Sequence, residues 1–288
     1  MKRTLGSVVG ACALLVSVSA SGQLVKGAPT VRLDTAGKNA VDDLTWRTAE
    51  GGGVVFNAAA AVVTGTDKLV QTSVGPREWE PVTLKGPIPG ASSARFVTDL
   101  GDAVVTMSTD GIKVGKLSMP SADPSVKQYR PGTPSIGNVT FGVRRPAPAA
   151  IAAWRATALQ GLDARKTITV ELRGAGGEVL RKYTLQQCQP VSFSGVNVKP
   201  GVETLDTVVA RCARIDVAGS ARPGFVSWLT SFNAGVDYRR NVTLVEGVRR
   251  FSYGDAWILE YGLPALDKRT EGEAVETVVF QPATVTGP

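Results

Sequence analysis

Two stretches of the chain repeat one another. The first is WRATALQGLDARKTIT at residues 154–169, and the second is WLTSFNAGVDYRRNVT at residues 228–243. Trp154 and Trp228 open the two stretches. Gly161 and Gly235 follow at the same distance, ahead of an Asp, a basic pair and a Thr that both stretches share. So many matches at one spacing indicate a duplicated segment.

The repeat is expected to continue beyond these stretches. On the same register Tyr183 matches Trp257, and one gap later Glu203-Thr204-Leu205 matches Glu276-Thr277-Val278. The predicted repeat-equivalent structural positions are therefore Trp154 with Trp228, Gly161 with Gly235, and Glu203 with Glu276.

The residue types at these positions favour packing over chemistry. Both tryptophans lie on the apolar face of a predicted helix, which indicates a place in the core. Two equivalent carboxylates lack the different environments that a catalytic acid and base require. Each glutamate is instead expected at a strand edge, paired with Arg165 or Arg239.

A weaker repeat precedes these stretches, so the order along the chain is front half, front half, back half, back half. Gly75 and Gly132 each precede a strand-like run, residues 81–84 and 138–141, and the spacing is the same in both. This order predicts a continuous module at 94–220 nested within a split module formed by 28–92 and 223–287. The halves could instead pair by strand exchange, and the sequence leaves both arrangements open.

The residue patterns predict a mainly β, β-rich α+β fold, with two nested antiparallel β-barrel or sandwich modules. Residues 167–172 alternate polar and apolar types, and a glycine-rich turn at 174–177 precedes a return strand from Val179 to Leu185. Each back half opens with one short helix, at 148–161 and 223–235. Each helix has Pro near its start and Gly at its end.

The amino terminus has the pattern of a bacterial export signal. Lys2 and Arg3 precede an uncharged apolar run, and Val18-Ser19-Ala20 offers a small-x-small cleavage site. Residues 1–20 are therefore interpreted as a signal peptide, and no segment is long enough to be a transmembrane helix. The expected location is secreted or periplasmic. A lipid anchor on Cys12 is the less favoured alternative.

The mature chain retains two cysteines, Cys188 and Cys212, for which an oxidising compartment favours a disulfide. The sequence contains no histidine, which excludes Ser-His-Asp triads, Cys-His dyads and histidine-containing zinc sites. We expect no catalytic residue, no cofactor and no metal. The formal net charge of +7 is spread along the chain, so no nucleic-acid partner is predicted.

The back halves resemble the phage tail tube protein family of contractile tails and related injection particles. The resemblance rests on the helix with Trp, the Gly, the basic pair, the Thr-Ile/Val-Thr strand and the hairpin after it. It implies a small β-barrel with one helix that stacks in rings by sharing sheet edges and performs no catalysis. The duplication is similar to tail hub proteins, in which three two-module chains imitate a six-membered ring.

The sequence therefore predicts an exported, non-enzymatic structural protein that self-assembles through sheet edges. A homo-oligomer, either a trimer or a ring, follows from the resemblance, and a component of the cell envelope is a possible partner. The alternative is a monomeric extracellular β-sandwich that binds a glycan, a peptide or an envelope component. For that alternative the candidate contact residues are Trp46, Trp79 and Tyr129.

Overall fold

The computed structural model describes residues 30–35, 38–52, 54–56, 61–64, 69–72, 77–122, 126–194, 203–234, 239–246 and 248–287. The predicted signal peptide, Cys12 and Gly235 lie outside the described residues. Within the described residues the chain forms two large antiparallel sheets, two short hairpins and two helices. The prediction of a mainly β fold with two short helices is confirmed.

The ten-stranded sheet combines strands from both ends of the chain with two from its middle. Its strands are β1 (Thr30–Thr35), β2 (Lys38–Thr45), β3 (Thr48–Gly51), β8 (Val82–Ser92), β11 (Ile112–Met119), β12 (Gln128–Ile136), β18 (Arg240–Glu246), β19 (Arg249–Gly262), β21 (Glu273–Gln281) and β22 (Thr284–Thr286).

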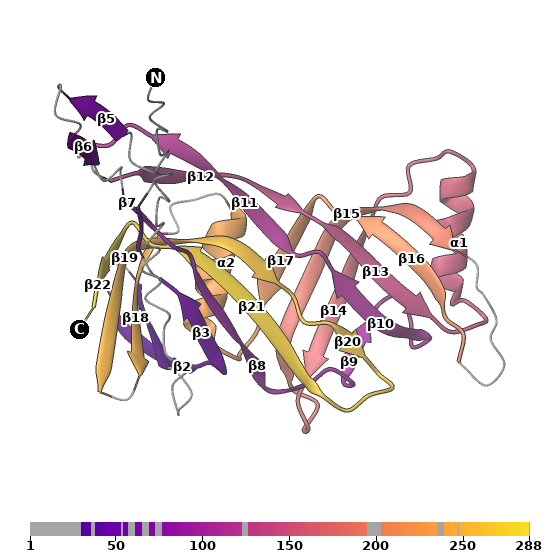
Figure 1. Cartoon of the computed structure of the whole chain (residues 1–288). Helices are drawn as coiled ribbons and strands as arrows, with labels where there is room; N and C mark the ends of the chain where they lie inside the picture. Colours follow the sequence, from indigo (N-terminus) through magenta and orange to yellow (C-terminus); the bar gives the residue numbers. More distant parts are fainter. Residues whose placement is uncertain are drawn as a thin grey trace, which may run out of the picture.

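The eight-stranded sheet is drawn mainly from the middle of the chain. Its strands are β9 (Phe96–Thr98), β10 (Val104–Thr109), β13 (Asn138–Val143), β14 (Lys166–Arg173), β15 (Val179–Ser194), β16 (Asp206–Arg211), β17 (Arg214–Ala218) and β20 (Leu266–Asp267). The remaining strands pair as β4 (Val54–Phe56) with β7 (Arg77–Trp79), and β5 (Ala61–Thr64) with β6 (Leu69–Thr72). Figure 1 shows the two sheets side by side.

The two sheets share one strand order. The ten-stranded sheet contains the path β1-β18-β19-β21-β8-β3, and the eight-stranded sheet contains β9-β14-β15-β16-β13-β10. In addition, β22 pairs with β19 as β17 pairs with β15. Strands from opposite ends of the chain thus repeat the arrangement that the middle segment forms.

The irregularities of the ladders coincide as well. β14 and β15 shift register between Lys166 and Ile168, and β18 and β19 shift between Arg240 and Val242, 74 positions further along. The extra residues of these bulges include Gln187 and Asp255, the two non-glycine residues of β15 and β19 with positive φ, at 51° and 48°. Matching bulges support the duplication more strongly than matching residue types, because a bulge is a specific backbone feature.

Local sequence explains each back half. Along β14 the side chains of Ile168, Val170 and Leu172 are buried while their neighbours are partly exposed, as alternation requires. α1 (Ala149–Leu159) begins after Pro148, and Gly161 follows its end with φ +70°, a conformation that glycine adopts at low cost. α2 (Pro223–Ala234) has Pro at its first position.

The hairpin connections correct the predicted register beyond residue 173. Eight residues separate the paired residues Leu172 and Arg181, whereas two separate Glu246 and Arg249. The equivalent of Cys188 is therefore Ala256, since these residues pair with Lys166 and Arg240. The expected match of Tyr183 with Trp257 is wrong because the first hairpin connection is six residues longer.

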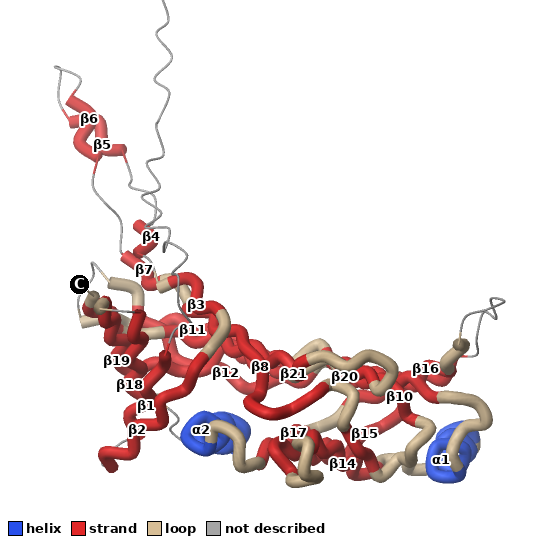
Figure 2. Tube along the Cα trace, turned by 90° about the horizontal axis from the view of Figure 1, so that it is seen from below, coloured by secondary structure: helices blue, strands red, loops and turns tan. Residues whose placement is uncertain are grey.

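In Figure 2 the two helices lie on either side of β14, β15 and β17. α1 contacts β15, near the far end of the eight-stranded sheet. α2 contacts β1 and β2 of the ten-stranded sheet and also β17 of the other sheet. α2 is therefore wedged where the two sheets meet.

Candidate assembly site at the joint of the two sheets

Two strand pairings and one helix contact connect the two large sheets, and together we call them the joint. β11, which follows β10 in the chain, pairs with β19, with Ile112 opposite Tyr261 and Lys113 opposite Glu260. β20, which follows β19, pairs with the outer edge of β10. α2 packs on β17, where Thr230 Oγ1 donates to the Val217 carbonyl at 3.4 Å. Each half thus extends a strand onto the other.

A cluster of buried charges lies at the joint. Glu276 on β21 accepts hydrogen bonds from Arg181 Nη2 at 3.2 Å, Arg222 Nη1 at 2.6 Å and the Tyr261 hydroxyl at 3.0 Å. The Tyr261 and Tyr183 hydroxyl oxygens are 3.2 Å apart. Arg181 and Tyr183 come from β15, so the cluster joins the sheets through polar contacts that are shielded from water.

Burial governs the electrostatics of this cluster. Desolvation raises the pKa of Tyr183 and of Tyr261 well above the usual value of a tyrosine, so both hydroxyls are protonated at neutral pH. Two guanidinium groups then face one carboxylate. Removing that carboxylate would leave two uncompensated cations in the core, which is the costly way to break a buried ion pair.

The structure places the predicted tryptophans in the core. Trp154 is buried on α1, contacts Phe193 edge-on, and donates from Nε1 to the Ala164 carbonyl at 2.5 Å. Trp228 is buried on α2 and its ring lies 6.0 Å from that of Phe280. Gly161 ends α1, as described above.

The predicted equivalence of Glu203 and Glu276 is wrong. Val139 of β13 and Val82 of β8 are equivalent, so Val143 and Gly86, four residues further along, are equivalent too. Val143 pairs with Asp206, and Gly86 pairs with Glu276. Asp206 is therefore the counterpart of Glu276 in the ladder. Glu203 precedes β16 at the surface, whereas Glu276 is fully buried in β21.

The ion pairs expected for the two glutamates are also wrong. Glu203 pairs with Arg144, and Glu276 pairs with Arg181 and Arg222. Arg165 pairs instead with Asp163. Sequence reasoning missed Arg181 and Arg222 because no local pattern indicates a contact across 95 or 54 residues.

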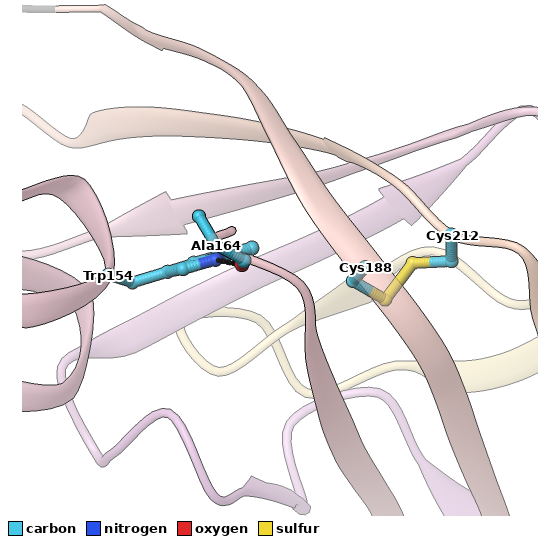
Figure 3. Close-up of a disulfide and its surroundings, with 4 residues drawn as sticks. All are labelled: Trp154, Ala164, Cys188 and Cys212. Carbon is cyan, nitrogen blue, oxygen red and sulfur yellow. Dashed lines mark hydrogen bonds between the residues drawn. A yellow bond between two sulfur atoms is a disulfide. The ribbon is translucent and has the colours of Figure 1, made fainter. Parts of the chain in front are cut away.

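Cys188 and Cys212 form a buried disulfide with an S–S distance of 2.04 Å (Figure 3). It links the end of the β14–β15 hairpin to the residue that follows β16. No group of three or more His, Cys, Asp and Glu side chains within the described residues could hold a metal ion. No helix in the described part of the chain is long and apolar enough to cross a membrane.

The aromatic residues considered as ligand contacts separate into two groups. Trp46 is buried, packs edge-on against Phe225 at 5.5 Å and stacks under the Arg222 guanidinium at 4.1 Å, so it is a core residue and not a ligand contact. Trp79 and Tyr129 form the second group, because both line one cavity together with Trp257.

The joint uses strand edges whose counterparts pair with no further strand among the described residues. β18 pairs with β19 only as far as Ala256, and β11 pairs with residues 260–261 further along β19. The matching part of β15 is Ser192 and Phe193, and within the described residues only β16 pairs with it. β3 likewise matches β10. β10 pairs with β20 along its outer edge, but no described strand pairs with the matching edge of β3.

No family model and no curated protein matches the sequence. Among solved structures, the tube-terminating cap of the anti-feeding prophage is 20% identical and covers 46% of this chain and 92% of its own, with a TM-score of 0.39. The sheath–tube complex of the PVC extracellular contractile injection system in its extended state is 18% identical, covers 46% and 93%, and has a TM-score of 0.38. Hcp1 from Salmonella typhimurium is 12% identical, covers 53% and 94%, and has a TM-score of 0.26. These matches are components of contractile injection systems and an Hcp protein, and each spans about half of this chain.

Proposed function

We propose that the protein is an exported, non-enzymatic structural protein that assembles head to tail, with the joint inside one chain repeated between chains. We infer that the two modules are nested, with residues 94–220 forming one and residues 28–92 with 223–287 forming the other. Their matching strand orders and bulges support this division. The uncovered edge of β15 is the observation that carries the proposal.

The geometry of the joint defines the expected contact. Ile112 and Lys113 of β11 pair with Tyr261 and Glu260. β4 follows β3 as β11 follows β10, so β4 is the counterpart of β11. By the same register, Val54 and Val55 of β4 would pair with Phe193 and Ser192 of a neighbouring chain. Backbone pairing of this kind completes a ladder that would otherwise end in unpaired peptide groups.

Exposure of apolar side chains supports an absent neighbour at the same place. Val191 on β15 is 59% exposed, whereas its counterpart Leu259 is partly buried against the core. Leu159 on α1 is 76% exposed, and Ala152 and Arg155 are exposed along the helix. Their counterparts on α2 include Val226 and Leu229, which are buried.

An interface formed by different surfaces on its two sides repeats with each added chain. Such a contact produces a closed ring where the rotation closes and a filament where it does not. A ring of three two-module chains is the arrangement that the resemblance to tail hub proteins implies. The structural role also explains why the buried polar groups described above make ion pairs instead of lining an open active site.

Export is supported by the disulfide. A buried cystine is stable in the periplasm or outside the cell, whereas the cytoplasm keeps thiols reduced. The proposed location is therefore secreted or periplasmic, in agreement with the signal-like residues 1–20.

The test is the mass of the purified mature protein, measured by light scattering and native mass spectrometry, with negative-stain microscopy of the particles. We expect an oligomer that Val191→Lys disrupts, because a charged side chain on an edge strand opposes strand addition. Val248→Lys is the matched control, since Val248 is fully exposed in the turn after β18, away from the β15 edge. A wild-type protein that stays monomeric at high concentration would refute the proposal.

A further inference from the structure

A short ribbon formed by β4 and β7 is separate from both large sheets (Figure 2). The chain turns between β3 and β4 at Gly51 and Gly52, whose φ angles of +96° and +80° are conformations that glycine adopts at low cost. Each strand of the ribbon has three residues, and a two-stranded ribbon is at best marginally stable in water by itself. Contacts with other parts of the chain must therefore hold this ribbon in place.

One side chain of the ribbon contacts both strands of the β11–β12 hairpin. Glu78 of β7 accepts hydrogen bonds from Lys116 Nζ of β11 at 3.0 Å and from the Tyr129 hydroxyl of β12 at 3.0 Å. Lys116 Nζ also lies 5.1 Å from the centre of the Tyr129 ring. The side chains of Glu78 and Lys116 are only 22% and 29% exposed, so water screens their attraction less than it would at the open surface.

The carboxyl group of Glu78 is charged at neutral pH. Partial burial would raise its pKa, but the hydrogen bonds from Lys116 and Tyr129 outweigh burial and hold the pKa below the usual value of a glutamate. The contact with the hairpin is therefore an ion pair combined with a hydrogen bond from a neutral hydroxyl.

Glu78 lies next to the strand edge that is expected to bind a neighbouring chain. It is directly opposite Val55 in the ribbon, and Val55 is the residue expected to pair with Ser192 of the neighbour. β7 pairs with one edge of β4, and within the described residues no strand pairs with the other edge. Because the two strands share one ladder, the contacts that fix β7 also fix the direction in which the outer edge of β4 points.

The equivalent position of the β11–β12 hairpin carries no acid. Ser135 lies opposite Lys113 in that hairpin, as Glu78 lies opposite Val55 in the ribbon. Ser135 Oγ donates to the Lys113 carbonyl at 3.2 Å, so this side chain bonds within its own hairpin. Pairing with β19 of the same chain already fixes the hairpin. The carboxylate thus lies in the ribbon whose outer edge has no strand partner among the described residues.

We propose that Glu78 is a positioning residue for assembly, and that its contacts with Lys116 and Tyr129 hold β4 where β15 of a neighbouring chain can pair with it. This inference rests on the proposed function, since it requires that β4 pairs with β15 between chains. A ribbon that is fixed in advance loses less conformational freedom when the chains associate, so the contact strengthens assembly indirectly.

The first test measures the position of the ribbon without assembly. Hydrogen exchange is followed by mass spectrometry in the Val191→Lys background, which is expected to be monomeric. Adding Glu78→Gln should speed exchange of the amides of residues 54–56 and 77–79 about tenfold, because local opening becomes easier. The amides of residues 112–113, in the joint, should exchange at the parent rate. Glu80→Gln, which removes the same charge from an exposed position two residues away, is the matched control. Equal exchange in the Glu78→Gln and Glu80→Gln variants would overturn the proposal.

The second test measures the strength of assembly in the absence of Val191→Lys. Sedimentation velocity over a dilution series should show that Glu78→Gln raises the dissociation constant of the oligomer about tenfold, as expected when preorganisation is lost. Glu80→Gln should assemble like the wild type. Lys116→Gln should also weaken assembly, and its effect should not add to that of Glu78→Gln in the double variant, because both remove one contact.

The outcomes separate this inference from the proposed function. Normal assembly of Glu78→Gln would overturn the positioning role alone and leave assembly through β15 in place. Additive losses in the double variant would overturn it as well, because Glu78 would then act without Lys116. A wild-type protein that stays monomeric would overturn both proposals. Circular dichroism of each variant confirms that it is folded.

Discussion

At the scale of single residues, Glu276 holds most of the polar contacts of the joint. Its carboxylate contacts two arginines and a tyrosine from three parts of the chain, and all four side chains are buried or nearly so. Matching residue types between the two repeats did not predict this site, because it paired Glu276 with Glu203. Its nearest counterpart in the ladder, Asp206, pairs with Arg145 at the surface.

Glu276→Gln is expected to lower the free energy of unfolding by roughly 3–5 kcal/mol, because it removes the counter-charge of Arg181 and Arg222 in the core. Urea denaturation of the mature protein measures the change. Glu203→Gln is the matched control, since Glu203 pairs with Arg144 at the surface and such a pair contributes at most ~1 kcal/mol. Equal losses in the two variants would contradict a special role for the buried carboxylate.

The buried tyrosines predict loss of stability at high pH. Burial raises the pKa of Tyr183 and Tyr261 in the folded state above the value of about 10 that tyrosines have in unfolded chains. Below pH 10 both states keep these protons, so stability is unaffected. Above it the unfolded state loses protons that the folded state retains. The free energy of unfolding then falls by up to ~1.4 kcal/mol per pH unit for each tyrosine.

Urea denaturation between pH 8 and pH 11, with tyrosinate absorbance recorded in parallel, measures this effect. The double variant Tyr183→Phe/Tyr261→Phe should show a shallower decline than the parent. A parent and variant with the same slope would mean that other groups cause the alkaline loss.

At the scale of elements, the sequence predicted the type of each repeated element better than its register. The helices and the β14–β15 hairpin follow from alternation and from the Pro and Gly that bound them. The register beyond the hairpin was wrong by six positions, because the length of a surface connection leaves no trace in the alternation of the strands that it joins. Backbone pairing, and not residue identity, defines the correct equivalences.

The ladders predict that the disulfide stabilises the fold without determining it. Cys188 occupies the position that Ala256 occupies in the other sheet, where the same strand order forms without a cystine at that position. The double variant Cys188→Ala/Cys212→Ala should therefore fold, with its free energy of unfolding lower by about 3 kcal/mol, as expected for a loop of this length. Urea denaturation and near-ultraviolet circular dichroism measure both points. An unfolded double variant would show that the cystine is required.

At the scale of the whole molecule, the order of half-repeats predicted two nested modules, while the joint came only from the structure. Strand additions such as β20 on β10 involve two residues each and carry no sequence signature. The cavity was likewise only partly foreseen. Trp79 and Tyr129 were candidates, but nothing in the sequence shows that they line one cavity with Trp257 and Gln281.

The proposed export predicts the first residue of the mature protein. Cleavage after Ala20 leaves Ser21 at the amino terminus, and intact-mass measurement of protein recovered from outside the cytoplasm identifies it. A mature chain that begins at an acylated Cys12 would replace this interpretation with a lipid anchor. A chain that retains Met1 and residues 2–20 would contradict export by this route.

The pairing of β1 with β18 and of β8 with β21 has a consequence for the timing of synthesis. When residue 218 has been made, nearly all of the eight-stranded sheet can already form, and only β20 is missing from it. β1 and β8 can pair early with β2 and β3, but their other edges stay open until β18 and β21 have been made. We expect them to remain accessible to chaperones throughout that interval, since an unpaired strand edge is prone to aggregation.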